Sequence, residues 1–167
     1  MFKVVYIMIV VMFASIASVA NANCSPEQEI RALALNMYHE ARGQGPDGML
    51  LVAEVTLNRV ESDHFPDTVC GVVYQGRKDA NGNMLRHRCQ FSWYCDGLSD
   101  RARNENMWDQ VEELATNVLN GDIELLNIGA THYLNPTKVS RMPRWTRKYE
   151  LVGTWGDHHF YAMGDRL

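Results

Sequence analysis

Glu40 is the acidic residue of this 167-residue chain whose position best suits proton transfer. It lies in the run YHEARG at residues 38–43, after an apolar helical stripe and before a glycine-rich break. Because one side of its carboxyl borders that stripe, burial is expected to raise its pKa. A glutamate that stays protonated near neutral pH can act as the general acid that cleaves a glycosidic bond. The alternative, from position alone, is a surface glutamate paired with His39 or Arg42.

No second carboxyl group stands at an obvious partner position. Glu54 lies inside an apolar helical stretch, which indicates a structural carboxylate paired with Arg31 or Arg59. Asp96 and Asp100 fit loop or helix-cap positions. Ordinary retaining and inverting glycosidases use two carboxyl groups, whereas a sugar that supplies its own nucleophile can react with one. The sequence is therefore compatible with a mechanism that uses a single carboxyl group.

Metal and serine chemistry have weaker support. No His-Glu-x-x-His pattern exists, and the adjacent His158 and His159 diverge in a strand or a helix. Catalytic zinc needs three convergent ligands, so we expect no metal and no other cofactor. Ser92 lacks the Gly-x-Ser-x-Gly pattern of a nucleophile elbow.

A glycan site also needs side chains that stack on sugar faces and bond to hydroxyl and acetamido groups. Several aromatic and polar residues lie in loop-like segments, where side chains are less often part of the core. The predicted substrate-binding residues are Tyr38, Gln90, Phe91, Ser92, His132, Tyr133, Asn135, Trp145 and His158.

Helices dominate the elements that must position these residues. A capping box at Ser25 and Gln28 begins a first helix, whose apolar residues continue at helical spacing to Ala41. A second helix over residues 47–60 is apolar on nearly every side, which predicts the centre of the core.

The rest of the chain predicts shorter elements and one long helix. Asp67 can cap a short helix that runs to Tyr74, and a mostly loop region follows over residues 75–97. The later pattern predicts a turn or hairpin tip at 79–83, an amphipathic helix at 103–120, and short strands at 131–134, 151–155 and 158–161. The fold class is α+β, mainly α, in a single domain with a small β or irregular portion.

Residues 1–22 resemble an export signal. Lys3 precedes an apolar run from Val4 to Val19, and an Ala-Asn-Ala sequence follows, as signal peptidase accepts. The mature domain is then residues 23–167. A short uncleaved anchor is the alternative, although the run is shorter than the roughly 20 residues of a relaxed membrane span. We expect no stable membrane association after cleavage.

An exported chain with four cysteines predicts two disulfides, for which three connectivities exist. The favoured pairing joins Cys89 to Cys95 in a small loop and Cys24 to Cys70 near the N-terminus. A structural zinc site is weaker, because the spacing lacks two close cysteine pairs.

The formal net charge is −4, which gives no basic field for nucleic acid. A local basic cluster nevertheless contains no acid. Such a cluster is usually a solvated face, but it could contact a polymer that carries carboxylates. Its members are Lys138, Arg141, Arg144, Arg147 and Lys148.

Six short motifs follow one another along the chain: YHEARG (38–43), NRV (58–60), GVVYQ (71–75), QFS (90–92), HYLNP (132–136) and GDHHFY (156–161). Each is weak alone. Together, in this order, they resemble the SleB/CwlJ-type cell-wall hydrolase family over nearly all of residues 30–161.

The resemblance implies a peptidoglycan-cleaving catalytic domain with a lysozyme-like fold related to lytic transglycosylases. Glu40 matches the catalytic glutamate of the family. It would protonate the oxygen between N-acetylmuramic acid and N-acetylglucosamine, then accept the proton of the muramyl C6 hydroxyl as an anhydro ring closes. The implied substrate is the glycan strand of peptidoglycan. The implied protein is an exported monomer, periplasmic or secreted, at the cell wall.

Other functions stay open at this stage. A muramidase would use water, a metal-dependent N-acetylmuramoyl-L-alanine amidase would cut the peptide from the sugar, and a wall-binding module would have no activity. The best-known family members act on spore cortex beside a separate wall-binding domain. This chain shows no such appended module, so cortex specificity is not expected.

Overall fold

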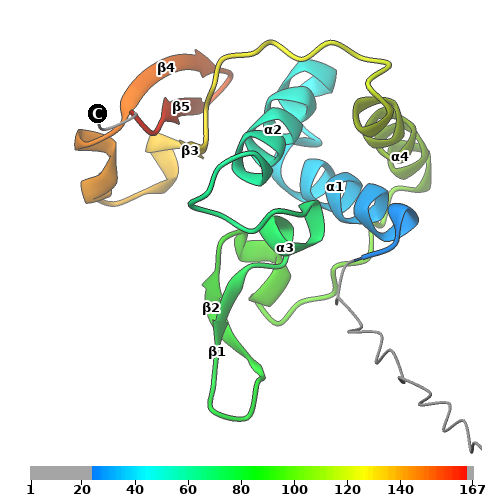
Figure 1. The fold of residues 1–167 in the computed structure, drawn as a ribbon, viewed down its shortest axis with the longest axis horizontal. Helices are drawn as coiled ribbons and strands as arrows, with labels where there is room; N and C mark the ends of the chain where they lie inside the picture. Colours follow the sequence, from blue (N-terminus) through cyan, green and yellow to red (C-terminus); the bar gives the residue numbers. More distant parts are fainter. Residues whose placement is uncertain (1–23, 165–167) are drawn as a thin grey trace, which may run out of the picture.

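The computed structural model describes residues 24–164. The predicted export signal lies outside the described residues. Within them, no helix has the length and apolar character needed to cross a membrane. Four α-helices form one end of the molecule, and a small sheet lies at the other end (Figure 1).

Helix α1 (Pro26–Ala41) has the helices α2 (Gly45–Val60), α3 (Val69–Val73) and α4 (Glu105–Asn120) packed around it. Its predicted capping box is present: the Gln28 N–H donates to Ser25 Oγ, and the Ser25 N–H donates to Gln28 Oε1. Every residue from 32 to 38 is buried. The sequence favours the second helix as the centre of the core. Both α1 and α2 contact all three other helices, but the contact of α2 with α4 is slight and that of α1 is extensive.

The remaining helices follow the sequence closely, with small shifts at their ends. Helix α2 begins two residues before its predicted start, and the cap of α3 is Thr68 rather than Asp67, because the Thr68 hydroxyl accepts the Gly71 N–H. Asn104 caps α4, which ends at Gly121 in the left-handed conformation that favours glycine.

A hairpin replaces most of the loop predicted over residues 75–97. Strands β1 (Gly76–Lys78) and β2 (Met84–Cys89) pair antiparallel around the predicted tip, where Asp79 accepts backbone N–H groups. The strands are largely exposed and rich in charged residues, so they lack the apolar alternation that identifies a strand.

Both favoured disulfides are present in the structure. Cys24 is bonded to Cys70, which attaches the start of the described chain to α3. Cys89 is bonded to Cys95, which attaches the end of β2 to the short 3₁₀-helix η1 (Ser92–Cys95). All four cysteines lie within the described residues, and each is part of a disulfide.

The C-terminal sheet is antiparallel, with strand order β3-β5-β4. Its strands are β3 (His132–Leu134), β4 (Glu150–Trp155) and β5 (His158–Ala162), each within one residue of its prediction. Tyr133 on β3 lies opposite Phe160 on the central strand. The connection from β3 to β4 contains the 3₁₀-helices η2 (Pro136–Lys138) and η3 (Arg144–Arg147).

Glu54 joins α2 to the segment that leads into the sheet. Its buried carboxylate accepts the backbone N–H groups of residues 127–129, at 3.0 Å from Asn127. The structure therefore corrects the predicted pairing with Arg31 or Arg59. A turn of backbone N–H groups offers a carboxylate several donors at once, and sequence spacing does not reveal it.

Replacement of Glu54 by Gln is expected to lower the free energy of unfolding by about 2 kcal/mol, because an amide cannot accept all three N–H groups. Urea denaturation measures this loss. Glu113→Gln, an exposed change on α4, is the matched control and should unfold like the wild type. Equal stability of both variants would contradict the role of Glu54.

Candidate active site

Three elements place polar side chains around one carboxyl group. Glu40 lies in the last turn of α1, Arg59 at the end of α2, and Tyr133 on β3. The charge of Arg59 and the hydroxyl of Tyr133 both act on the partly buried Glu40 carboxyl. Helices and sheet thus meet at this carboxyl.

Burial raises the pKa of Glu40 above its ordinary value. The Tyr133 hydroxyl and the positive charge of Arg59 act in the opposite direction, but desolvation is the larger effect. Among the described residues, no other carboxyl group contributes to this pKa. The site therefore combines one acid, one cation and one hydroxyl.

The neighbours of Glu40 in sequence do not pair with it. The His39 ring stacks on Trp93 with ring centres 4.7 Å apart, and its Nε2 bonds to the carbonyl of Asp100. The guanidinium of Arg42 lies over the ring of Tyr38. The alternative of a surface glutamate paired with His39 or Arg42 is wrong.

Several contacts position Arg59, whose charge acts on Glu40. Its Nε donates to the carbonyl of Thr131 at 2.7 Å, and its guanidinium lies 5.2 Å from the ring centres of both Phe65 and Phe91. The side chain is buried, and its Nη1 has no hydrogen-bond partner. Sequence reasoning assigned this arginine to Glu54 and missed its place in the site. The available signal was the NRV motif at residues 58–60.

Tyr133 offers a second buried donor. Burial and the nearby Glu40 raise the pKa of its phenol, so the hydroxyl keeps its proton. That hydroxyl lies beside the Glu40 carboxyl but outside regular hydrogen-bond geometry, and it has no other partner. It is therefore free to donate to a carboxylate that forms next to it.

Two histidines of lowered pKa lie near this centre. Burial and the charge of Arg59 lower the pKa of His132 to about 4. Burial also lowers the pKa of His158, whose ring packs edge-on against Tyr133 and whose Nδ1 bonds to Gln44 at 2.6 Å. Among the groups that act on the pKa of Glu40, Arg59 supplies the positive charge.

The structure distributes the predicted substrate-binding residues among several places. Tyr133 lies at Glu40, Phe91 and His132 lie around Arg59, and His158 lies behind Tyr133. The Trp145 ring packs on the rings of His132 and Tyr161.

The other predicted residues make contacts elsewhere or are exposed. The buried Tyr38 hydroxyl accepts the backbone N–H groups of Arg103 and Asn104, so it holds the start of α4. Asn135 caps η2 through its own side chain. Gln90 and Ser92 are exposed near η1.

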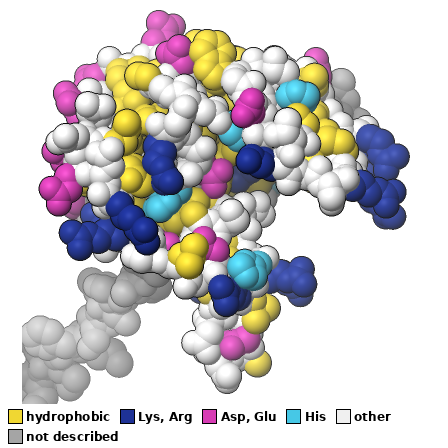
Figure 2. Space-filling model, turned by 180° about the vertical axis from the view of Figure 1, so that it is seen from behind, with side chains coloured by type: hydrophobic (Ala, Val, Ile, Leu, Met, Phe, Trp, Pro, Cys, Tyr) yellow, Lys and Arg dark blue, Asp and Glu magenta, His cyan; other side chains and the backbone are white. Residues whose placement is uncertain are grey.

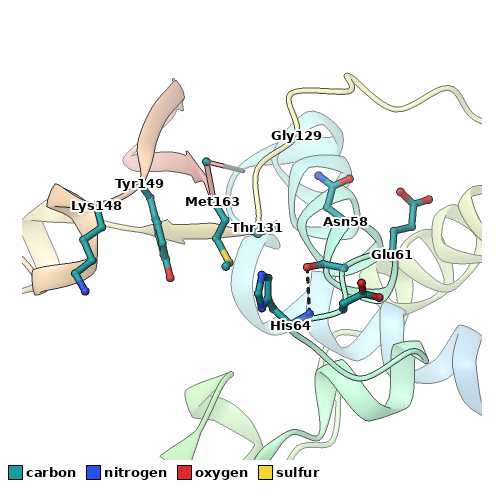
Figure 3. A pocket seen from close by; sticks show the side chains of 11 residues that line it. Asn58, Glu61, His64, Gly129, Thr131, Lys148, Tyr149 and Met163 are labelled. Carbon is teal, nitrogen blue, oxygen red and sulfur yellow. Dashed lines mark hydrogen bonds between the residues drawn. The ribbon is translucent and has the colours of Figure 1, made fainter. Parts of the chain in front are cut away.

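Two cavities flank the centre. The larger, about 1060 Å³, lies between the end of α2 and the C-terminal sheet, and Asn58 and Thr131 line it (Figure 3). The smaller, about 400 Å³, lies beside Tyr38, His39 and the loop before α4. Glu40 lines neither cavity. Figure 2 shows a hollow between the helical body and the smaller C-terminal part, with acidic, histidine and basic side chains around it.

Among residues 24–164, one group of three potential metal ligands lies close together: Cys24, Glu29 and Cys70. Both sulfur atoms belong to a disulfide, and Glu29 accepts the Cys70 N–H. These side chains do not suit a metal ion.

The fold is that of a cell-wall-degrading catalytic domain. The structure resembles the catalytic domain of the germination-specific lytic transglycosylase SleB from Bacillus anthracis, with a TM-score of 0.61, 28% identity and coverage of 86% of this chain and 99% of that one. The catalytic domain of the Bacillus cereus SleB protein gives a TM-score of 0.55 at 27% identity, over 84% and 93% of the two chains. The predicted α+β class is confirmed.

The Cell Wall Hydrolase family model matches residues 43–161, and the chain belongs to this family. A spore cortex-lytic enzyme of Oceanobacillus iheyensis is 32% identical over 121 residues, which are 72% of this chain and 37% of that protein. One of Bacillus cereus is 31% identical over 121 residues, 72% of this chain and 40% of that protein. The chain spans well under half the length of these relatives. Glu40 precedes the matched range, so its assignment rests on its surroundings in the fold.

Glu40→Gln is expected to change the pH dependence of stability. Because folding raises the pKa of Glu40, the folded state holds its proton more tightly, and stability falls as pH rises through the folded pKa. A glutamine has no proton to lose. The melting temperatures of wild type and variant should be similar near pH 4, and the variant should be the more stable near pH 8.

Thermal melting at a series of pH values measures this difference, with Glu113→Gln as the control that shows no such trend. A Glu40→Gln protein that is less stable than the wild type at pH 8 would contradict the claim that burial raises the pKa of Glu40.

Proposed function

We propose that this enzyme is a lytic transglycosylase that cleaves the glycosidic bond between N-acetylmuramic acid and N-acetylglucosamine in peptidoglycan, with Glu40 as general acid and then general base. The observation that carries the proposal is the Glu40 carboxyl, whose pKa burial raises, with Arg59 and Tyr133 acting on it and, within residues 24–164, no second carboxyl acting on it. The solved neighbour described as a lytic transglycosylase supports the same reaction.

In the first step, the Glu40 carboxyl gives its proton to the bridging oxygen as the bond from that oxygen to muramyl C1 breaks. N-acetylglucosamine leaves with a new hydroxyl, and Glu40 becomes a carboxylate. The positive charge of Arg59 stabilises that carboxylate, and the free Tyr133 hydroxyl can donate to it.

In the second step, the Glu40 carboxylate takes the proton of the muramyl C6 hydroxyl while the C6 oxygen bonds to C1. The product is a 1,6-anhydro-muramyl end, and Glu40 regains its proton for the next cycle. The sugar supplies the nucleophile, so the second carboxyl group of ordinary glycosidases is not needed. Export and a monomeric state stay predictions from the sequence.

The products decide between this reaction and its alternatives. Mass spectrometry of muropeptides released from purified sacculi should find anhydro ends, one water lighter than hydrolysed ends. Glu40→Gln should reduce release by about 10²- to 10⁴-fold, the usual effect of removing a general acid. Glu113→Gln should act like the wild type.

Hydrated reducing ends would instead identify a muramidase. Chelator-sensitive release of stem peptides from intact glycan would identify an amidase. Sacculus binding without any cleavage would identify a wall-binding module.

Tyr133→Phe tests whether the Tyr133 hydroxyl stabilises the Glu40 carboxylate between the two steps. Loss of the hydroxyl removes a group that lowers the pKa of Glu40, so the pKa of Glu40 should rise further. The alkaline limb of the pH–rate profile should then move to higher pH, and the maximal rate should fall about tenfold. Tyr94→Phe, on η1, is the matched control. An unchanged profile at full rate would remove Tyr133 from the mechanism.

A further inference from the structure

We infer that the larger cavity, between the end of α2 and the C-terminal sheet, binds the stem peptide of peptidoglycan. The inference rests on the proposed function, since it names the part of the same substrate that lies beside the cleaved bond. It concerns a cavity that Glu40 does not line.

The cavity has the size and the walls of a binding site. Its volume of about 1060 Å³ is large enough for several amino acid residues beside a sugar. Asn58, Glu61 and His64 lie on the α2 side, and Lys148, Tyr149 and Met163 lie on the side of the sheet (Figure 3). The two walls come from segments far apart in the sequence.

The charges on these walls fit a peptide better than a glycan. Glu61 and Asp63 are exposed on one wall, and Lys148 is exposed on the other. In peptidoglycan, the sugar chain is neutral where each lactyl carboxyl group is amide-linked to a stem peptide. The stem peptide carries carboxylates and commonly the ammonium group of a diamino acid. Lys148 can pair with a stem carboxylate, and Glu61 or Asp63 can pair with the ammonium group.

The cavity adjoins Arg59 of the candidate active site. Asn58 and Thr131 line it, and both adjoin Arg59: Asn58 precedes Arg59 on α2, and the carbonyl of Thr131 accepts the Arg59 Nε–H at 2.7 Å. The stem peptide is attached to muramic acid through the lactyl group on the ring whose C1 reacts. A muramyl residue placed at Glu40 therefore has its peptide within reach of this cavity.

Lys148 differs from the rest of the basic cluster in its position at the cavity. The five cations at residues 138–148 are all exposed, and Lys and Arg side chains gather at the end of the C-terminal part (Figure 2). Of these five, only Lys148 lines the cavity. Arg141 has the same charge in the same cluster, so Arg141→Ala is a matched control for Lys148→Ala.

The experiment compares kcat/KM on two soluble glycans of equal length, one with its stem peptides and one from which an amidase has removed them and whose freed lactyl carboxyl groups have been converted to amides. The wild type should prefer the glycan with peptides. Lys148→Ala should lower this preference about tenfold, as expected for one lost charge-assisted hydrogen bond, and should leave cleavage of the bare glycan unchanged. The double variant Glu61→Gln, Asp63→Asn should also lower the preference.

Three results would overturn the inference: no preference in the wild type, an equal effect of Lys148→Ala on both glycans, or an equal effect of Arg141→Ala and Lys148→Ala. Melting temperatures establish that each variant is folded. Anhydro products from the bare glycan with no preference between substrates would leave the proposed function intact while removing the peptide site. No anhydro product from either glycan would instead remove the proposed function.

Discussion

The buried Arg59 side chain links the helical part of this molecule to the C-terminal sheet. Its guanidinium lies over Phe65 and Phe91, and its Nε donates to the carbonyl of Thr131. A guanidinium is planar and keeps its charge, so it can stack on aromatic faces while its edge donates to a carbonyl. Arg59 thereby joins α2 to the strand that carries Tyr133. Its position determines where the charge beside Glu40 lies.

Arg59 and Glu40 do not form an ordinary ion pair. In water, a nearby cation would lower the pKa of a carboxyl and leave it ionised, but desolvation of Glu40 has the larger effect. The result is an acid that keeps its proton longer than a surface glutamate and whose conjugate base still has a cation and a hydroxyl beside it. A group that must first donate and then accept one proton needs both properties.

The polar contacts between the helices and the sheet support this arrangement. Glu54 fixes the segment at residues 127–129 that leads into β3, and Gln44 bonds to His158 behind Tyr133. Asn58 donates to the carbonyl of Ala130 on the same path. Each contact joins residues more than 70 positions apart in the chain, so the position of the Tyr133 hydroxyl depends on several long-range bonds at once.

Local rules predicted most of the elements well, because α1 and α4 carry clear start or stop signals. The Ser25 capping box, the Asn120-Gly121 end of α4 and the aromatic strands of the sheet needed only neighbouring residues. The exposed hairpin at residues 76–89 was less visible, because no buried face imposes an alternating pattern on it.

The sequence by itself determined the helical class, the disulfide pairs that it favoured and the candidate acid Glu40. Only the tertiary structure decided that Arg59, rather than His39 or Arg42, acts on that acid, and that Glu54 binds backbone N–H groups instead of an arginine. The physical reason is that a pKa depends on the charges and the solvent within a few ångströms of a group. Residues from α1, α2 and β3 supply those surroundings here, and no local pattern encodes how far apart they lie after folding.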